Sequence, residues 1–180
     1  SGLCKMVSGL SRGLMSVFEG ADFFAFATRF VEAIPHVKEL GISVVTAAPG
    51  TAVIKLPYRE DLIGNPDTGV LHGGVITTIL DEIMSWSAIH LLKKLVMTKT
   101  MTVDFINPLH VGDDLTAKGR ILKVSSRHEA VIEGFLSNSD NEICAKSEGI
   151  FATFSPKVAI RLGIIKDERA KWLSELLGSN

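Results

Sequence analysis

A glycine-rich loop that runs directly into an apolar segment is the part of this sequence best suited to chemistry. Residues 64–74 read Gly-Asn-Pro-Asp-Thr-Gly-Val-Leu-His-Gly-Gly, and the apolar run that follows carries Asp81. The pattern predicts a helix that begins at the two glycines. A helix start leaves backbone N–H groups unbonded at the positive end of the helix dipole, where they can polarise a carbonyl or hold an anion. Such donors near a buried carboxylate suggest acyl-transfer chemistry.

The carboxylate at Asp81 has two interpretations. Thr77, Thr78 and Ser85 lie four residues before, three before and four after it, which predicts a small polar face on an apolar helix. A carboxylate in such a helix is costly unless it is paired or used, so Asp81 is either a catalytic group or a structural hydrogen-bond acceptor. Glu82 points about 100° away around the helix, and we interpret it as a structural or interface residue.

The loop and helix start offer four further candidates. The N–H of Gly73 could donate to a substrate carbonyl oxygen, whereas Gly74 could be required only for a tight turn. His72 could cap the helix and brace the loop, contact the substrate, or bind a metal, but no partner ligands stand at metal-binding spacing. Asn65 could orient water or a carbonyl, or cap the loop.

Composition limits the class of protein. The chain has 180 residues, 46% of them hydrophobic, which suits one domain with a sizeable core. The net charge of −1, with scattered Lys and Arg, argues against nucleic-acid binding. Two cysteines and five separated histidines form no disulfide or metal pattern. No stretch approaches the roughly 20 apolar residues of a membrane span, and no signal-peptide run follows Lys5 and Arg12. We expect a cytoplasmic protein with no membrane segment, metal or cofactor.

Periodicity predicts the elements that hold these residues. An apolar run at helical spacing, Phe23 to Ile34, predicts an N-terminal helix that ends at Pro35. The long helix from Gly74 to about Leu95 is apolar nearly all round, so we expect it to be buried. A short amphipathic helix is expected at about residues 166–177. The predicted strands are Ile42–Ala48 and Thr51–Tyr58 before the long helix, and Thr100–Phe105, Leu115–Val124, Glu129–Ser137 and Glu142–Phe154 after it.

The order of these elements predicts an α+β fold. One helix interrupts the strands, which favours a single antiparallel sheet wrapped around one buried helix. The exposed face of such a sheet usually needs another layer, often a second subunit. We divide the chain into a helical extension (1–40), a central domain (41–156) and a helical tail (157–180).

The central domain resembles the hotdog-fold acyl-CoA thioesterases, in particular the phenylacetyl-CoA and 4-hydroxybenzoyl-CoA thioesterase-like branch. The resemblance covers about Ile42 to Phe154. It implies a homodimer or homotetramer in which two sheets join edge to edge and each active site uses both subunits. Asn65 stands seven residues before His72, whereas about six are expected in this family. The motifs that carry the resemblance are Asn65…Gly69-Val70-Leu71-His72-Gly73-Gly74…Asp81 and Thr102-Val103-Asp104-Phe105-Ile106-Asn107-Pro108…Gly112-Asp113.

The resemblance implies hydrolysis of an acyl-CoA thioester to a free acid and CoA, without a metal or redox cofactor. Gly73 would be the oxyanion donor, with Gly74 beside the substrate, and Asp81 would be the general base or the nucleophile. A hydroxyl on the next strand would support Asp81. Thr98, Thr100 and Thr102 are expected on one face, and alignment back from Pro108 favours Thr98.

Candidate binding residues can also be named for the acyl end and for the CoA phosphates of the substrate. Trp86, Met84 and Phe105 could line the acyl end, although core packing is the alternative for each. The rival functions are a non-catalytic acyl-CoA-binding protein on the same scaffold and a hotdog hydratase or dehydratase. The candidates for the phosphates of CoA are Lys123, Ser125, Ser126, Arg127 and His128.

Overall fold

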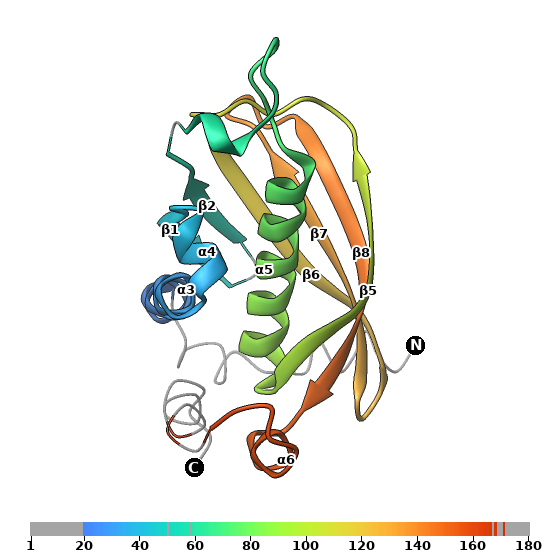
Figure 1. The fold of residues 1–180 in the computed structure, drawn as a ribbon. Coiled ribbons are helices and arrows are strands. Elements are labelled where there is room, and N and C mark those ends of the chain that lie inside the picture. The colour runs from blue at the N-terminus through green and yellow to red at the C-terminus, as the bar shows by residue number, and fades with distance from the viewer. Residues whose placement is uncertain (1–19, 50, 58, 167, 169–170, 172–180) are drawn as a thin grey trace.

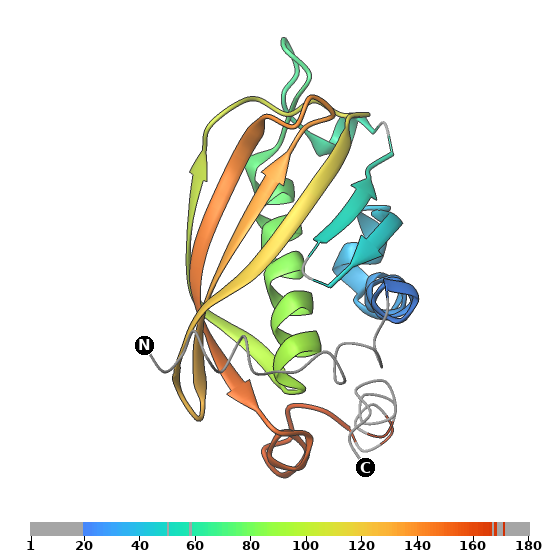
Figure 2. The ribbon, with the colours of Figure 1, turned by 180° about the vertical axis from the view of Figure 1, so that it is seen from behind.

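One antiparallel sheet wraps around a central helix in the computed structural model, which describes residues 20–49, 51–57, 59–166, 168 and 171. The helix, α5 (Gly73–Leu92), lies on the concave face of the sheet (Figure 1). Figure 2 shows the convex face, with α5 behind it. The predicted α+β hotdog arrangement is therefore confirmed. Within the described residues, this sheet has six strands in the order β1 (Ser43–Ala48), β2 (Thr51–Lys55), β6 (Asp114–Ser126), β7 (Glu129–Ser137), β8 (Ile143–Phe154) and β5 (Leu95–Phe105).

The core lies between α5 and the sheet. Because the sheet curves around the helix, apolar side chains on several sides of α5 are buried, among them Ile79, Leu80, Ile83 and Trp86. The prediction of a buried helix is confirmed, but α5 ends at Leu92 rather than near Leu95. Lys93 has a left-handed backbone, and β5 begins two residues later. Leu95, which helical periodicity had assigned to the helix, therefore belongs to β5.

The expectation that no stretch approaches a membrane span is wrong for α5. By its length and composition alone, α5 could cross a membrane, and it is the one helix among the described residues that meets this test. Inside the protein, 61% of its most apolar window is buried. Packing against the curved sheet accounts for this apolarity, as it does in the core helix of a soluble domain.

Two N-terminal helices cover the β1–β2 end of the sheet (Figure 1). They are α3 (Gly20–Ala33) and α4 (Pro35–Glu39), so the predicted helix ends two residues before Pro35, where a second helix begins. Phe23 and Phe26 of α3 belong to the same hydrophobic cluster as the core of the sheet. The described part of the N-terminal extension therefore packs as part of the domain. Residues 1–19 of the predicted extension lie outside the described residues.

Short elements complete the described chain. A turn of 3-10 helix, η1 (Glu60–Leu62), leads into the hairpin of β3 (Ile63–Asn65) and β4 (Val70–Leu71), which projects beyond the start of α5. Helix α6 (Pro156–Arg161) follows β8 and was not predicted. Ser155 caps it, since its hydroxyl accepts a hydrogen bond from the N–H of Val158. The helix predicted at 166–177 lies largely outside the described residues.

Candidate active site

The start of α5 leaves one backbone donor unbonded. His72 is the N-cap, and its Nδ1 accepts a hydrogen bond of 2.9 Å from the N–H of Gly74. The N–H of Val75 donates to the carbonyl of His72 at 2.9 Å. Among the described residues, no acceptor takes the N–H of Gly73. Gly73 therefore presents a free donor at the positive end of the helix dipole.

His72 is fixed in the capping arrangement. Its own N–H donates to the carbonyl of Leu62 at 2.8 Å, which ties the loop to η1. Because Nδ1 accepts a hydrogen bond, the proton of the neutral ring is on Nε2. The same bond occupies the N–H of Gly74. Within the described residues, no group of three His, Cys, Asp or Glu side chains could hold a metal ion.

Asp81 and Thr98 form a hydrogen-bonded pair. The hydroxyl of Thr98, on β5, donates to Oδ1 of Asp81 at 2.6 Å. Asp81 is half-buried, so its second carboxylate oxygen can still accept from water or substrate. The neighbouring Thr77 and Thr78 do not share this role, because their hydroxyls donate to the carbonyls of Gly73 and Gly74 one turn earlier.

A β-bulge gives Thr98 this position and corrects one expectation. Thr98 pairs with Phe151, but Thr100 pairs with Ile150, so the register shifts at the residue between them. Directly paired residues share a face of the sheet. Phe151 is fully buried against α5, whereas Ile150 is half-buried on the other face. The prediction that Thr98, Thr100 and Thr102 share one face is therefore wrong.

Glu82 points to a different side of α5 from Asp81. Its Oε2 accepts a hydrogen bond of 2.9 Å from Nε1 of Trp86, and it lies beside Ile42, Ile54 and Ala117 near β1 and β2. Burial raises the pKa of Glu82 to about 7, although the bond from Trp86 opposes this and the charge of Asp81 adds to it. These contacts agree with the structural interpretation of Glu82.

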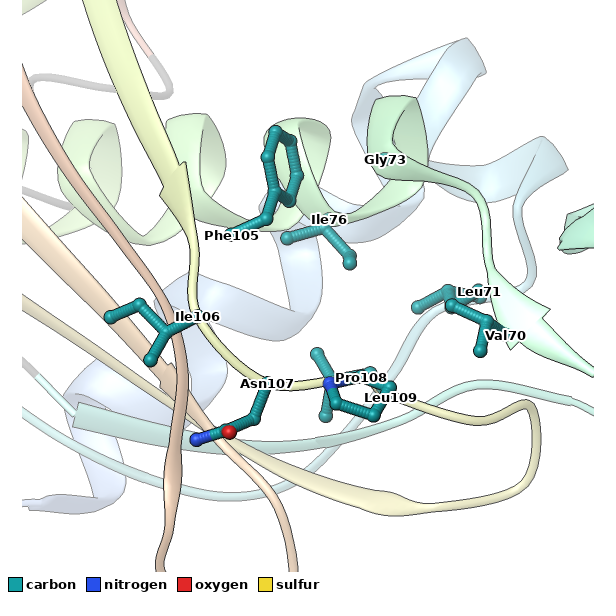
Figure 3. Close-up of a pocket in the computed structure, with 9 residues that line it drawn as sticks. All are labelled: Val70, Leu71, Gly73, Ile76, Phe105, Ile106, Asn107, Pro108 and Leu109. Atoms are coloured by element: carbon teal, nitrogen blue, oxygen red, sulfur yellow. The ribbon is translucent and has the colours of Figure 1, made fainter. Parts of the chain in front are cut away.

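An apolar pocket of about 330 Å³ opens beside Gly73 (Figure 3). It lies between β4 and the first turn of α5 on one side and residues 105–109 on the other. The ring of Phe105 covers Gly73: a β-carbon built on Gly73 would be 3.3 Å from its Cζ. Phe105 itself is 57% exposed, whereas Trp86 and Met84 are buried in the core. Of the three candidates for the acyl end, only Phe105 lines this pocket.

Asn65 is the last residue of β3, where the turn of the β3–β4 hairpin begins. Its Oδ1 accepts a hydrogen bond of 3.0 Å from the N–H of Asp67, and its carbonyl accepts one of 2.9 Å from Gly69. Asn65 thus makes the loop-capping contacts that were one of its two interpretations. Gly69 has a φ of +70°, which favours glycine at this point of the turn.

The candidate phosphate-binding residues lie near the other end of α5. The turn after β6 is held to Lys94, whose Nζ donates to the carbonyl of Arg127 at 2.8 Å. Lys94 follows the C-terminal end of α5, a helix of 20 residues, which is about 30 Å long. Within one chain, Lys123, Ser125, Ser126 and Arg127 are therefore not brought together with Gly73.

The pocket residues other than Gly73 and Phe105 were missed by sequence reasoning. Ile106 is half exposed directly after β5. From the sequence, the motif that contains Ile106, Asn107 and Pro108 served only as evidence for the family resemblance, and these residues were not assigned to the site. The available signal was an apolar run that continues past the end of a strand and stops at a proline. What it could not show is that β4, far away in the sequence, lies across from it.

Comparison with known proteins identifies the class. The model of the thioesterase superfamily matches residues 68–145, which include the His-Gly-Gly loop, α5 and β5 to β7. These residues are therefore similar to the thioesterase superfamily, and the chain has the hotdog fold. This assignment by similarity supports thioester hydrolysis as the general class of reaction.

Individual relatives agree with this assignment. A protein of Saccharolobus solfataricus that is provisionally named an esterase is 28% identical over 122 residues, 67% of this chain and 84% of the relative. The acyl-coenzyme A thioesterase THEM4 of Xenopus laevis is 29% identical over 100 residues, 56% of this chain and 42% of the relative. The PaaI protein of E. coli, from the phenylacetic acid degradation operon, superposes with a TM-score of 0.63 at 20% identity over 76% of this chain and 96% of its own. At that identity, this last likeness shows the fold alone.

Proposed function

We propose that the protein is an acyl-CoA thioesterase, which hydrolyses an acyl thioester to a free acid and CoA. The observation that carries the proposal is the unbonded N–H of Gly73, at the start of α5 and beside an apolar pocket. A thioester carbonyl oxygen at this donor would gain negative charge as the carbonyl carbon is attacked. One well-placed donor of this kind typically contributes about 100- to 1000-fold in rate.

Asp81 supplies the second chemical function in this proposal. Thr98 holds one carboxylate oxygen and leaves the other free. As a general base, that oxygen takes a proton from water, the hydroxide adds to the carbonyl carbon, and the C–S bond breaks to release CoA thiolate. As a nucleophile, it forms a mixed anhydride with the acyl group and expels the thiolate, and water then hydrolyses the anhydride. Both routes use the same atoms of Asp81.

The proposed site is completed by a second subunit. Gly73 and Asp81 are eight residues apart on one helix, which separates them by about 12 Å along its axis. A carboxylate cannot reach across that distance to a carbonyl held at Gly73 of its own chain. The partner's Asp81 can do so if α5 helices pack side by side, the arrangement that the family resemblance implies. The CoA phosphates would then meet Lys123, Ser125, Ser126 and Arg127 of one of the two subunits.

Release of free thiol from a panel of acyl-CoA esters tests the proposal. Asp81→Asn removes the charge with little change in volume, so we expect kcat to fall to less than about a tenth of the wild-type value, as losing an essential base or nucleophile requires. Asp140→Asn, in the exposed turn before β8, is the matched control and is expected to keep full activity.

Two outcomes would favour the rival functions. Tight binding of acyl-CoA with no thiol release by wild-type protein would indicate the non-catalytic acyl-CoA-binding protein. Addition of water to an enoyl-CoA without thiol release would indicate a hydratase. An Asp81→Asn variant that keeps most of its thioesterase activity would exclude Asp81 as base or nucleophile, while leaving the hydrolase itself in place.

A further inference from the structure

The side chains that line the pocket beside Gly73 are mainly hydrocarbon. The residues that face it from β4 and α5 are Val70, Leu71 and Ile76, and those that face it from the far side include Phe105 and Leu109. No charged side chain lines it. We propose that this pocket receives the acyl group, that the preferred group is an uncharged hydrocarbon of medium length, and that Phe105 limits its size. This inference rests on the proposed function and names the substrate class for it.

The position of Gly73 in the pocket wall brings the substrate to this pocket. A thioester carbonyl carbon carries the acyl chain on one side and the sulfur on the other. When the carbonyl oxygen is bound at the N–H of Gly73, both substituents start beside the pocket, and the proposal places one of them inside it. The remaining question is which of the two enters.

The chemistry of the lining favours the acyl chain over the pantetheine arm of CoA. The arm contains two amide groups, and burying an amide without a hydrogen-bond partner is costly. Asn107 is the polar side chain of the lining, and its Nδ2 already donates to the carbonyl of Ile143 at 2.9 Å. In Figure 3 this side chain points away from the ring of Phe105 and from Ile76. A hydrocarbon needs no such partners, and a terminal carboxylate would be buried without a counter-charge.

The volume sets the size of the group. At about 330 Å³, the pocket has roughly twice the volume of an engineered apolar cavity of about 150 Å³ that binds benzene. An acyl group of roughly six to ten carbon atoms fills such a space. Phe105 forms the part of the wall next to the proposed carbonyl site, because its ring lies over Gly73. Removing the ring should lengthen the space without disturbing the core.

Binding of non-hydrolysable alkyl-CoA thioethers, measured by calorimetry, tests the pocket independently of catalysis. From CoA to hexyl-CoA we expect affinity for the wild-type protein to rise by at least about tenfold, since each buried methylene contributes favourably. Affinity should stop rising beyond decyl-CoA. In Phe105→Ala the rise should continue to dodecyl-CoA, whereas in Val70→Phe it should stop before hexyl-CoA. Leu162→Ala is the matched control, because Leu162 is 58% exposed and does not line the pocket.

The results that overturn the inference are distinct from those that overturn the proposed function. If hexyl-CoA binds no better than CoA, or if a terminal carboxylate on the hexyl chain costs less than about tenfold in affinity, the pocket does not select an apolar acyl group. If Val70→Phe weakens CoA as much as hexyl-CoA, the pocket holds the pantetheine arm instead. If the chain-length pattern appears as expected but wild-type protein releases no thiol from acyl-CoA, the binding inference stands and the hydrolase proposal fails.

Discussion

Thr98 owes its contact with Asp81 to a single irregularity in β5. The bulge before Thr100 turns Thr98 toward α5 and leaves Thr100 on the opposite face of the sheet. A hydrogen bond to an ionised carboxylate is worth more than one between neutral groups. In the proposed reaction, Thr98 is therefore a positioning residue, which orients Asp81 and leaves one carboxylate oxygen for the chemistry.

Thr98→Val tests this positioning role. The substitution keeps the shape of the side chain and removes the donor, so we expect kcat to fall by about tenfold, consistent with roughly 1.5 kcal/mol for a hydrogen bond to a charged group, with KM little changed. Thr98→Ser should restore most of the rate. Thr100→Val, the same change on the other face of the strand, should have no effect. Equal losses in both Val variants would mean that β5 was disturbed and that the hydroxyl has no specific role.

Glu82 should make stability depend on pH. Its pKa is raised by burial from 4.5 to about 7 in the folded protein, so between these values the folded state holds a proton that the unfolded state has lost. Stability therefore falls as pH rises through this range. Glu82→Gln keeps an acceptor for Trp86 and removes the titration. The variant should gain about 2 kcal/mol relative to wild type between roughly pH 5 and pH 8, measured by urea unfolding at fixed protein concentration. Parallel pH profiles for the two proteins would contradict this.

At the residue scale, the candidate residues could be identified from the sequence, but only part of their geometry could be predicted. Gly73 and His72 could be placed at a helix start because a glycine pair before an apolar run is a local signal. The contact of Thr98 with Asp81 depends on a bulge, which has no local signature in the run of alternating Thr and apolar residues. The hydrogen bond from the N–H of Gly74 to Nδ1 of His72 supports the capping interpretation, and this bond could not be predicted from the sequence.

At the scale of elements, close contact between α5 and the sheet depends on glycines in the strands. A β-carbon on Gly119 of β6 would lie 2.6 Å from the backbone oxygen of Ile83 and 2.5 Å from Oγ of Ser87. The helix can approach β6 this closely only because Gly119 has no side chain. The long apolar helix was predictable from its composition, but the strand glycines that receive it were not, since their role depends on the register of the sheet.

Gly119→Ala should push α5 away from β6. Because the obstructing atoms include helix backbone, which cannot rotate aside, we expect a loss of roughly 2–4 kcal/mol of unfolding free energy, at or above the usual cost of overpacking. Urea unfolding at a fixed protein concentration would measure it. Lys118→Ala, one residue earlier and exposed on the convex face, should change stability by less than about 0.5 kcal/mol. A fully stable Gly119→Ala protein would show that α5 can shift without cost.

At the scale of the whole molecule, β5 is the exposed edge of the sheet. It runs for 11 residues at the end of the strand order, and its surroundings include the exposed apolar side chains of Met97, Phe105 and Ile106. A long edge of this kind is a template for pairing with another chain. From the sequence, a second subunit could be expected as a cover for the exposed face of the sheet and through the family resemblance. The sequence could not identify β5 as the edge, because an edge strand looks like any other strand until the order of the sheet is known.

The protein is therefore expected to be at least a dimer at micromolar concentration, with β5 in the interface. Sedimentation of the wild-type protein would measure this. A monomer would leave the carbonyl site at Gly73 without a carboxylate, because its own Asp81 lies about 12 Å away along the helix. The dimer alone, however, does not show that the two subunits share an active site.

Mixed dimers test the sharing directly. Asp81→Asn removes the carboxylate, and Gly73→Val places a branched side chain against Phe105, where the thioester should lie. Each variant alone should be inactive. When the two are unfolded together and refolded at equal amounts, half of the dimers should be mixed, and each mixed dimer has one site with an intact Gly73 from one chain and an intact Asp81 from the other. We therefore expect recovery of about a quarter of wild-type activity, as a two-fold symmetric dimer requires. Mixed dimers proven by a size tag but lacking activity would show that Gly73 and Asp81 serve one site from the same chain, and the separation along α5 would then have to be bridged by a movement of the helix start.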